Sequence, residues 1–504
     1  MKMKTYILII FAAALFTISG CTNLDEHFYD KIAASNFYKT DEEINAGLMN
    51  VYYQLGASHN WLNQWQLQEC TTDHGMCPWG DGGVYKQDQL HTWDAAHGPM
   101  RDVYTGNYTT IAAANSFLAT LAIANPPNLE VISAEVRAIR AFAYLELVDL
   151  FANVPIVTVE KLDPTNLPKN AARVEVFNFI ESELKDAISK LPSLTTVKNR
   201  QALFPRIAKE TAQAILVKLY LNAEVYSGTA RWQDCITTAN AVINSGLYVL
   251  EPNIWNAFAP ENDKSLELIF AISKSNISYW DTGAGNWTDV LSMHGELKGA
   301  YRNGKDMNIT YNGWGGPSVL KEHFDIYDDS DIRKSLILMG KFYDKDGNLL
   351  IDIQPFSNTD IYNFNSPKEG LSCIKYQPDP LAVPPFQRND LVIIRYADIL
   401  LSKAEAQFRL GDAASALVLV NSVRQRNFSP DKPLLTLTAD DILSERSREF
   451  LWETNYRTDL VRFGKFTTIH TKWKLSDDPS YRNIFPIPQT ELQTNPNLKQ
   501  NPGY

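Results

Sequence analysis

The feature that most constrains this chain is a succession of apolar side chains at helical spacing. Residues 99–122 and 130–151 each repeat apolar positions three or four residues apart, and a Pro-Pro pair at 126–127 separates them. The same spacing recurs in four further stretches, 41–55, 173–190, 207–226 and 232–243. A helix with one apolar side must bury that side against another element. The sequence therefore predicts a mainly α fold in which successive helices pack together.

Two later stretches predict a pair of antiparallel helices. Residues 394–410 and 413–426 flank Gly411, which permits a tight turn. Small side chains near this turn let the two helices approach closely, namely Ala404, Ala406 and Ala416. The stretch 207–244 has a similar layout around Gly228. This layout is typical of tetratricopeptide-type (TPR) helix pairs, and the irregular lengths between pairs predict a TPR-like bundle instead of a regular solenoid.

The middle of the chain, about 251–392, has no sustained helical period. It is rich in Gly, Asn, Asp, Pro and aromatic residues. Short strands are expected at Leu266–Ile272 and Asn348–Ile353, with a turn at 345–348 before the second. We therefore expect the helical bundle to support a loop-rich, irregular region with short β-strands.

The N-terminus has the pattern of an export signal. Lys2 and Lys4 precede an apolar run from Tyr6 to Ile18, which is short for a membrane-spanning helix. Small residues then lead to Cys21, as in a bacterial lipobox, where the cysteine is lipidated and becomes the first mature residue. A lipid on Cys21 anchors a protein to a membrane without crossing it. An ordinary secretory signal with a chance cysteine is the alternative.

Composition excludes several classes of protein. The 504 residues carry a formal charge of -11, so the chain lacks the overall attraction for phosphate that nucleic-acid binding requires. A hydrophobic fraction of 45% argues against a disordered chain. Outside the first twenty residues no long apolar run occurs, which excludes a protein with several membrane spans.

Four cysteines remain after Cys21, and their spacing leaves three interpretations open. Cys70 and Cys77 are close enough in sequence to bridge in an oxidising compartment. Together with Asp73 and His74 they also offer metal ligands, although the spacing is not that of a zinc ribbon or finger. Unlinked structural thiols are favoured over both, and we expect no metal and no cofactor.

Ordered sequence blocks carry a family resemblance. They are Asn36–Glu43 with 47–53, Arg140–Phe151 with Val154-Pro155, Ile394–Leu401 with 404–406, Asn421–Arg426, Glu445–Phe450, Tyr456–Arg462 and the closing stretches 487–488 and 495–504. In this order, and behind a lipobox, they resemble the SusD/RagB family of outer-membrane lipoproteins over nearly the whole chain. The resemblance implies a SusD-like fold of four TPR-like helix pairs supporting a loop-rich face.

The resemblance also implies a role and a location. Such proteins sit on the outer surface of the outer membrane, bind glycans or in some cases peptides, and act with a SusC-like TonB-dependent transporter without catalysis. The expected organisation is a removed signal peptide at 1–20, an N-terminal helical part at 21–250, a loop-rich insert carrying the ligand face at 251–392, and a C-terminal part at 393–504.

Tryptophans in loop-forming segments are the candidate ligand contacts. Trp314, Trp287, Trp79 and Trp280 each lie beside Gly, Asn or Asp, in segments that cannot form helix cores. A flat aromatic ring covers the apolar C–H face of a sugar, while nearby polar groups bond its hydroxyl rim. Packing of these rings within the loops is the competing interpretation. Trp232 and Trp452, within helical patterns, are expected in the core.

Polar and aromatic neighbours complete the expected ligand face. They are Tyr301, Arg302, Asp306, Tyr311 and Asp81. Asp81 is the candidate partner of sugar hydroxyls, against the alternative that it caps its own turn.

The charged block at 445–462, within a helical region expected at 439–463, invites a catalytic interpretation. Glu449 and Glu453 lie four apart on one helical face, a separation that a glycosidase pair also shows. Interleaved arginines favour ion pairs that hold the C-terminal helices.

Three functions remain open: a surface lipoprotein that binds oligosaccharide for a transporter, a lipid-anchored glycoside hydrolase, and a peptide-binding or protein-adaptor lipoprotein of the RagB type.

Overall fold

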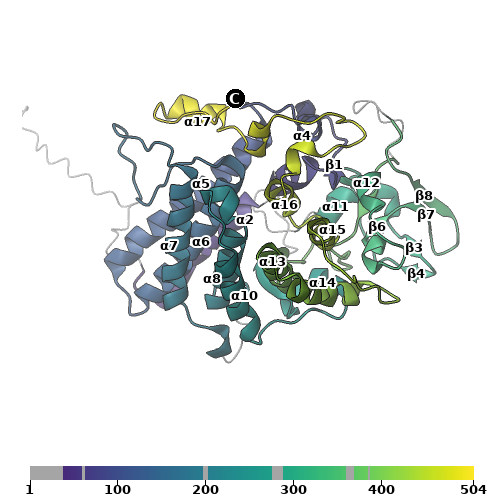
Figure 1. The fold of residues 1–504 in the computed structure, drawn as a ribbon, viewed down its shortest axis with the longest axis horizontal. Helices are drawn as coiled ribbons and strands as arrows, with labels where there is room; N and C mark the ends of the chain where they lie inside the picture. The colour runs from purple at the N-terminus through teal and green to yellow at the C-terminus, as the bar shows by residue number, and fades with distance from the viewer. Residues whose placement is uncertain are drawn as a thin grey trace, which may run out of the picture.

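The computed structural model describes residues 38–59, 63–196, 203–274, 286, 288–358, 368–383 and 386–504. Helices dominate these residues and the strands are short, so the expected mainly α, TPR-like architecture is confirmed. Figure 1 shows the helices of residues 98–244 gathered on one side, the strands of residues 301–353 on the other, and the helices of residues 396–449 between them. Among the helices of the described ranges, none has both the length and the apolar composition that crossing a bilayer requires.

The N-terminal half is a series of neighbouring helices. These are α2 (Asp41–Ser58), α3 (Asn63–Trp65), α4 (Val84–Leu90), α5 (Gly98–Ala124), α6 (Leu129–Phe151), α7 (Arg173–Lys190), α8 (Lys209–Leu221), α9 (Ala223–Ser227) and α10 (Trp232–Asn244). Helix α5 packs between α2 and α6, α7 packs between α6 and α8, and α10 packs between α8 and α13. Helix α6 is apolar on almost every side and lies within the largest core cluster, which explains why the chain wraps around it.

The ends of these helices follow local chemistry. Helix α2 begins where Thr40 accepts a hydrogen bond from the backbone N–H of Glu43 at 3.2 Å, while the Glu43 carboxylate accepts one from the Thr40 N–H. Helix α9 ends at Gly228 and α10 is followed by Gly246, both at positive φ as a glycine cap requires. Trp232 is buried, as expected.

The described residues contain ten short strands, most of them in the loop-rich region. They are β1 (Gly75–Met76), β2 (Leu268–Ile272), β3 (Tyr301–Arg302), β4 (Lys305–Asp306), β5 (Ser318–Val319), β6 (Ile337–Leu338), β7 (Gly340–Tyr343), β8 (Leu349–Ile353), β9 (Ser372–Cys373) and β10 (Leu391–Arg395). The largest sheet has the order β4-β3-β7-β8, and three two-stranded sheets pair β1 with β5, β2 with β10, and β6 with β9. Two short helices, α11 (Thr288–Ser292) and α12 (Lys321–Phe324), lie among these strands.

The C-terminal part returns to helices. It contains α13 (Tyr396–Arg409), α14 (Ala413–Asn427), α15 (Ala439–Glu449), α16 (Tyr456–Arg462) and α17 (Gln489–Thr494). The expected pair around Gly411 is present, with Gly411 at φ 89°. The helical region expected at 439–463 consists of two helices, α15 and α16, with Trp452 and Thr454 at positive φ between them. Trp452 is buried in the core of the loop-rich region, as expected.

All four cysteines of the described ranges are buried and unlinked. Cys70 and Cys77 pack in the same core cluster as Trp65 and Trp452. Burial raises the pKa of the Cys70 thiol well above its ordinary value. Thiols in such surroundings behave as small apolar side chains.

Candidate functional site

Strand pairing brings two of the predicted tryptophans together. Strands β1 and β5 run antiparallel, with Gly75 opposite Val319 and Met76 opposite Ser318. In an antiparallel pair, residues that follow one strand meet residues that precede the other. Trp79 follows β1 and Trp314 precedes β5, so their rings lie side by side with centroids 6.2 Å apart and planes inclined by 45°.

The two rings border a hollow of about 470 Å³ on the loop-rich side of the molecule. Its lining combines the two indoles with a further aromatic ring, three glycines and three ionisable side chains. The residues are Pro78, Trp79, His294, Gly295, Glu296, Gly313, Trp314, Gly315, Phe356 and Glu369. Trp314 is 38% exposed, whereas Trp79 is half-buried against Tyr85. A hollow of this size with accessible aromatic faces has room for a sugar ring.

A glycine-rich loop holds Trp314 in place. The backbone N–H groups of Trp314, Gly315 and Gly316 donate to the carbonyl oxygens of residues 290, 293 and 291 at 2.8–3.0 Å. A Cβ atom on Gly313 would lie 2.0 Å from the Met293 carbonyl oxygen, and one on Gly316 would lie 2.3 Å from the Trp79 ring. The loop therefore packs against its support so closely that only glycine fits at these two positions.

Three ionisable groups supply the polar lining. The Nε2 atom of His294 lies 2.8 Å from the carbonyl oxygen of Gly370, which can only accept, so this nitrogen carries a proton. Glu369 accepts a hydrogen bond from the Ser357 hydroxyl at 2.6 Å. Glu296 is exposed. These groups can accept hydrogen bonds from hydroxyls lying over the rings.

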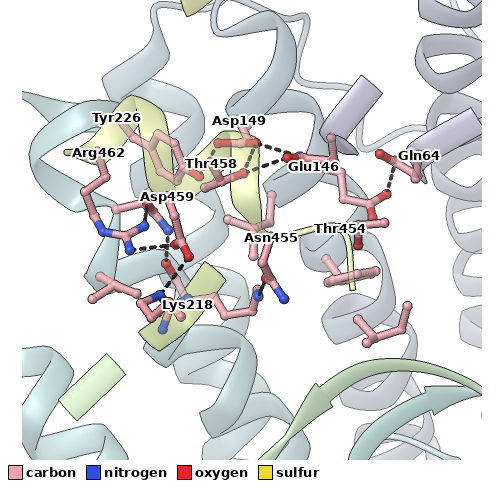
Figure 2. Close-up of a pocket in the computed structure, with 17 residues that line it drawn as sticks. Gln64, Glu146, Asp149, Lys218, Tyr226, Thr454, Asn455, Thr458, Asp459 and Arg462 are labelled. Atoms are coloured by element: carbon pink, nitrogen blue, oxygen red, sulfur yellow. Dashed lines mark hydrogen bonds and ion pairs between the residues drawn. The ribbon is translucent and has the colours of Figure 1, made fainter. Parts of the chain in front are cut away.

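A second pocket lies inside the helical bundle between α6, α8 and α16 (Figure 2). Its volume is about 60 Å³, which is room for about two water molecules at roughly 30 Å³ each. Its polar groups already bond one another: the Tyr226 hydroxyl donates to Asp149 at 2.8 Å, and the Arg462 guanidinium donates to Asp459 at 2.7 Å. This pocket is too small for a sugar ring.

The charged block around Glu449 is a buried ion-pair cluster. Arg395 and Arg333 donate to the Glu449 carboxylate at 2.6 and 2.8 Å, and Arg426 donates to it as well. Glu449 is fully buried. Burial alone would raise the pKa of this carboxyl, but the three guanidinium charges hold it well below its ordinary value. A group with no access to solvent and a stabilised negative charge cannot serve as a general acid on a polysaccharide.

Two family models match successive parts of the chain. A family model described as the SusD family matches residues 267–504, and one described as starch-binding associating with outer membrane matches residues 24–221. The chain belongs to the SusD/RagB family. At the level of this family, its relatives are described as glycan-binding proteins, and association with the outer membrane is part of the family description.

Individual relatives extend over almost the whole chain. The starch-binding protein SusD of Bacteroides thetaiotaomicron is 26% identical over 497 residues, covering 89% of this chain and 86% of that protein. A laminarin-binding SusD-like protein of known structure is 26% identical, with a TM-score of 0.75 over 93% of this chain and all of that one. A SusD homolog from Bacteroides thetaiotaomicron superposes with a TM-score of 0.76 at 20% identity, covering 94% of this chain and 98% of that chain, which supports the SusD fold.

Several residues predicted for the ligand face of this SusD-like protein do not line the hollow. Tyr301, Arg302 and Asp306 lie on the β3–β4 hairpin, where Arg302 donates to the Ser335 carbonyl oxygen at 2.7 Å. Asp81 is exposed in a turn at positive φ, next to Trp79 in sequence but outside the lining. These four remain accessible or partly accessible, but the fold does not bring them to Trp79 and Trp314.

The prediction for Tyr311 is wrong. Its side chain is 2% exposed and packs in the core cluster beneath the loop-rich region. The Gly- and Asn-rich sequence around it indicates a loop, but loop composition does not tell that this side chain faces inward. Trp280 and Trp287 lie outside the described residues.

Sequence reasoning missed the residues that complete the hollow. His294, Glu296, Phe356 and Glu369 come from segments that carry no recognisable motif. The only local indication of this part of the hollow was the doublet Gly295-Glu296, which directly follows a histidine in a segment rich in helix-breaking residues. Phe356 and Glu369 follow β8 in the sequence and reach the hollow only through the tertiary fold. Their place in the lining could not be predicted from the sequence.

Proposed function

We propose that this protein binds a glycan at the cell exterior, holding it against Trp79 and Trp314, and does not cleave it. The observation that carries this proposal is the convergence of two indoles, from segments far apart in the sequence, on one accessible hollow. Aromatic faces with adjacent hydrogen-bond acceptors match the apolar face and hydroxyl rim of a sugar. The starch-binding and laminarin-binding relatives support a glycan as the ligand class.

The proposed role includes delivery to a SusC-like TonB-dependent transporter, with the protein held at the outer membrane by a lipid on Cys21. The family description of outer-membrane association and the lipobox before Cys21 support this arrangement. Cys21 itself lies outside the described residues. A peptide ligand of the RagB type is the alternative.

A hydrolase is the second candidate, because two carboxylates, Glu296 and Glu369, line the same hollow. A glycosidase needs an acid kept protonated by apolar surroundings. Glu296 is exposed and Glu369 bonds Ser357, so neither is enclosed in that way. Incubation with a bound polysaccharide should therefore release no reducing ends, and release that disappears in the Glu296→Gln variant would establish the hydrolase instead.

Replacing Trp314 with Ala should weaken glycan binding by about 1–3 kcal/mol, because the half-exposed indole supplies one face of the hollow. This corresponds to roughly a 5- to 150-fold higher dissociation constant. Affinity electrophoresis against a panel of polysaccharides, followed by calorimetry on the one that binds, measures the change. Tyr343→Ala is the matched control, since Tyr343 is 41% exposed on β7 and outside the hollow. Unchanged binding by both Trp314→Ala and Trp79→Ala would remove the site.

Replacing Cys21 with Ser should release the protein from membranes, because a serine cannot accept the thioether-linked lipid and no described helix replaces the anchor. Fractionation of cells expressing each form, with immunodetection in the membrane and soluble fractions, measures the distribution. A variant that remains with the membranes after a high-salt wash would refute the lipobox interpretation.

A further inference from the structure

The charges that line the hollow have one sign. Glu296 and Glu369 contribute carboxylates, and neither lysine nor arginine occurs among the described residues of the lining. Within the described part of the chain, neither carboxylate forms an ion pair. No direct ion pair with a described residue neutralises either carboxylate, so both charges act on whatever occupies the hollow.

Positive groups near the hollow are turned to other partners. Lys472 donates from Nζ to the carbonyl oxygen of Phe356 at 2.6 Å, and its ammonium lies 5.3 Å from the ring centroid of Trp473. Lys298 and Lys368 are exposed and do not belong to the lining.

The polar lining also favours ligands that donate hydrogen bonds. Two carboxylates accept hydrogen bonds, while the backbone N–H groups of Trp314 and Gly315 are already bound to protein carbonyls. A sugar hydroxyl can donate to these acceptors. A uronate or sulfate group cannot donate, and it brings a negative charge toward two others.

We propose that the hollow selects uncharged glycans and disfavours polysaccharides that carry carboxylate or sulfate groups. This inference rests on the proposed function and adds the ligand class. A charge on the ligand about 7 Å from each carboxylate, at an effective dielectric constant of roughly 40–80, weakens binding about three- to eightfold per carboxylate at low salt. Screening shortens the range of this repulsion to about 10 Å at 0.1 M salt and 3 Å at 1 M.

The experiment uses the mature protein and matched ligands. Starch, laminarin, mannan, xylan and galactan are screened beside alginate, pectate and carrageenan, and the neutral glycan that binds is then chemically sulfated on the same backbone. We expect a neutral polysaccharide to bind and its sulfated form to bind at least tenfold more weakly in 20 mM NaCl. The ratio of the two affinities should shrink toward one in 0.5 M NaCl.

A double variant, Glu296→Gln with Glu369→Gln, tests the cause. It removes both charges and keeps an acceptor at each position, so the ratio of neutral to sulfated affinity should fall by about tenfold or more. Asp306→Asn removes an exposed charge outside the hollow and should leave the ratio as it is. A ratio that does not respond to the double variant would overturn the inference.

Other outcomes separate this inference from the proposed function. If alginate, pectate, carrageenan or the sulfated glycan binds as tightly as any neutral one, and Trp314→Ala weakens that binding, the inference fails while the proposed site stands. If Trp314→Ala and Trp79→Ala leave all binding unchanged, the proposed site fails and the inference falls with it. Binding of no polysaccharide at all removes both.

Discussion

Glu449→Ala should destabilise the folded protein by about 3–5 kcal/mol, the cost of removing one partner from a buried charge pair. The carboxylate of Glu449 accepts hydrogen bonds from Arg333, Arg395 and Arg426, and the first two of these arginines are fully buried. Without Glu449, their charges remain in the interior with fewer partners. Denaturant unfolding followed by tryptophan fluorescence measures the change in the free energy of unfolding.

Glu130→Ala is the matched control, because Glu130 is exposed in the first turn of α6 and should change stability by no more than about 0.5 kcal/mol. The isosteric Glu449→Gln separates charge from packing and should retain most of the destabilisation. Equal stability of the Glu449→Ala variant and the unaltered protein would contradict the ion-pair role.

The same cluster should make the protein sensitive to acid. Burial would raise the pKa of Glu445, but the charges of Arg333, Arg448 and Arg424 lower it to about 2, while an unfolded chain has the ordinary value near 4.5. A carboxyl whose pKa is depressed by folding contributes stability above the unfolded pKa and loses it as pH falls toward the folded one. The contribution of this cluster is therefore present at neutral pH and is lost between about pH 4.5 and 2.

Gly316→Ala should weaken glycan binding roughly 10- to 100-fold, comparable to removing an aromatic contact. The added Cβ would lie 2.3, 2.5 and 2.8 Å from three atoms of the Trp79 indole, so the ring must leave its present position. Because Trp79 and Trp314 border one hollow, displacing one ring changes the surface that both present to a ligand. Calorimetry with the bound polysaccharide measures the loss.

Gly80→Ala provides a control for the effect of an added methyl group close to the site. Gly80 is adjacent to Trp79, has ordinary helical φ and ψ, and a Cβ there meets no atom within 4 Å. This variant should bind glycan as the unaltered protein does. If Gly316→Ala also bound normally, the close packing of the glycine loop against Trp79 would not be required for the site.

Most of the helices could be predicted from the sequence because their apolar spacing is a local property. The helix predicted over residues 173–190 has those bounds in the structure, and the turn at Gly411 is present. The helical region predicted at 439–463 is interrupted between α15 and α16, where Trp452 is buried in the core and both it and Thr454 adopt positive φ. Local apolar spacing does not indicate such a break. The prediction that Tyr311 belongs to the ligand face failed for a related reason, because loop composition does not tell which side chains of a loop face inward.

Sequence alone determined the helical class of this protein, the family resemblance, and Trp79 and Trp314 as candidate contacts in loop segments. Only the tertiary structure decided that these two rings meet, because their proximity depends on the register of two short strands that lie more than two hundred residues apart. It also decided which charges border them. Spacing along the chain reports which side of a helix is apolar, whereas a site built from several loops exists only after long-range pairing has fixed each loop in space.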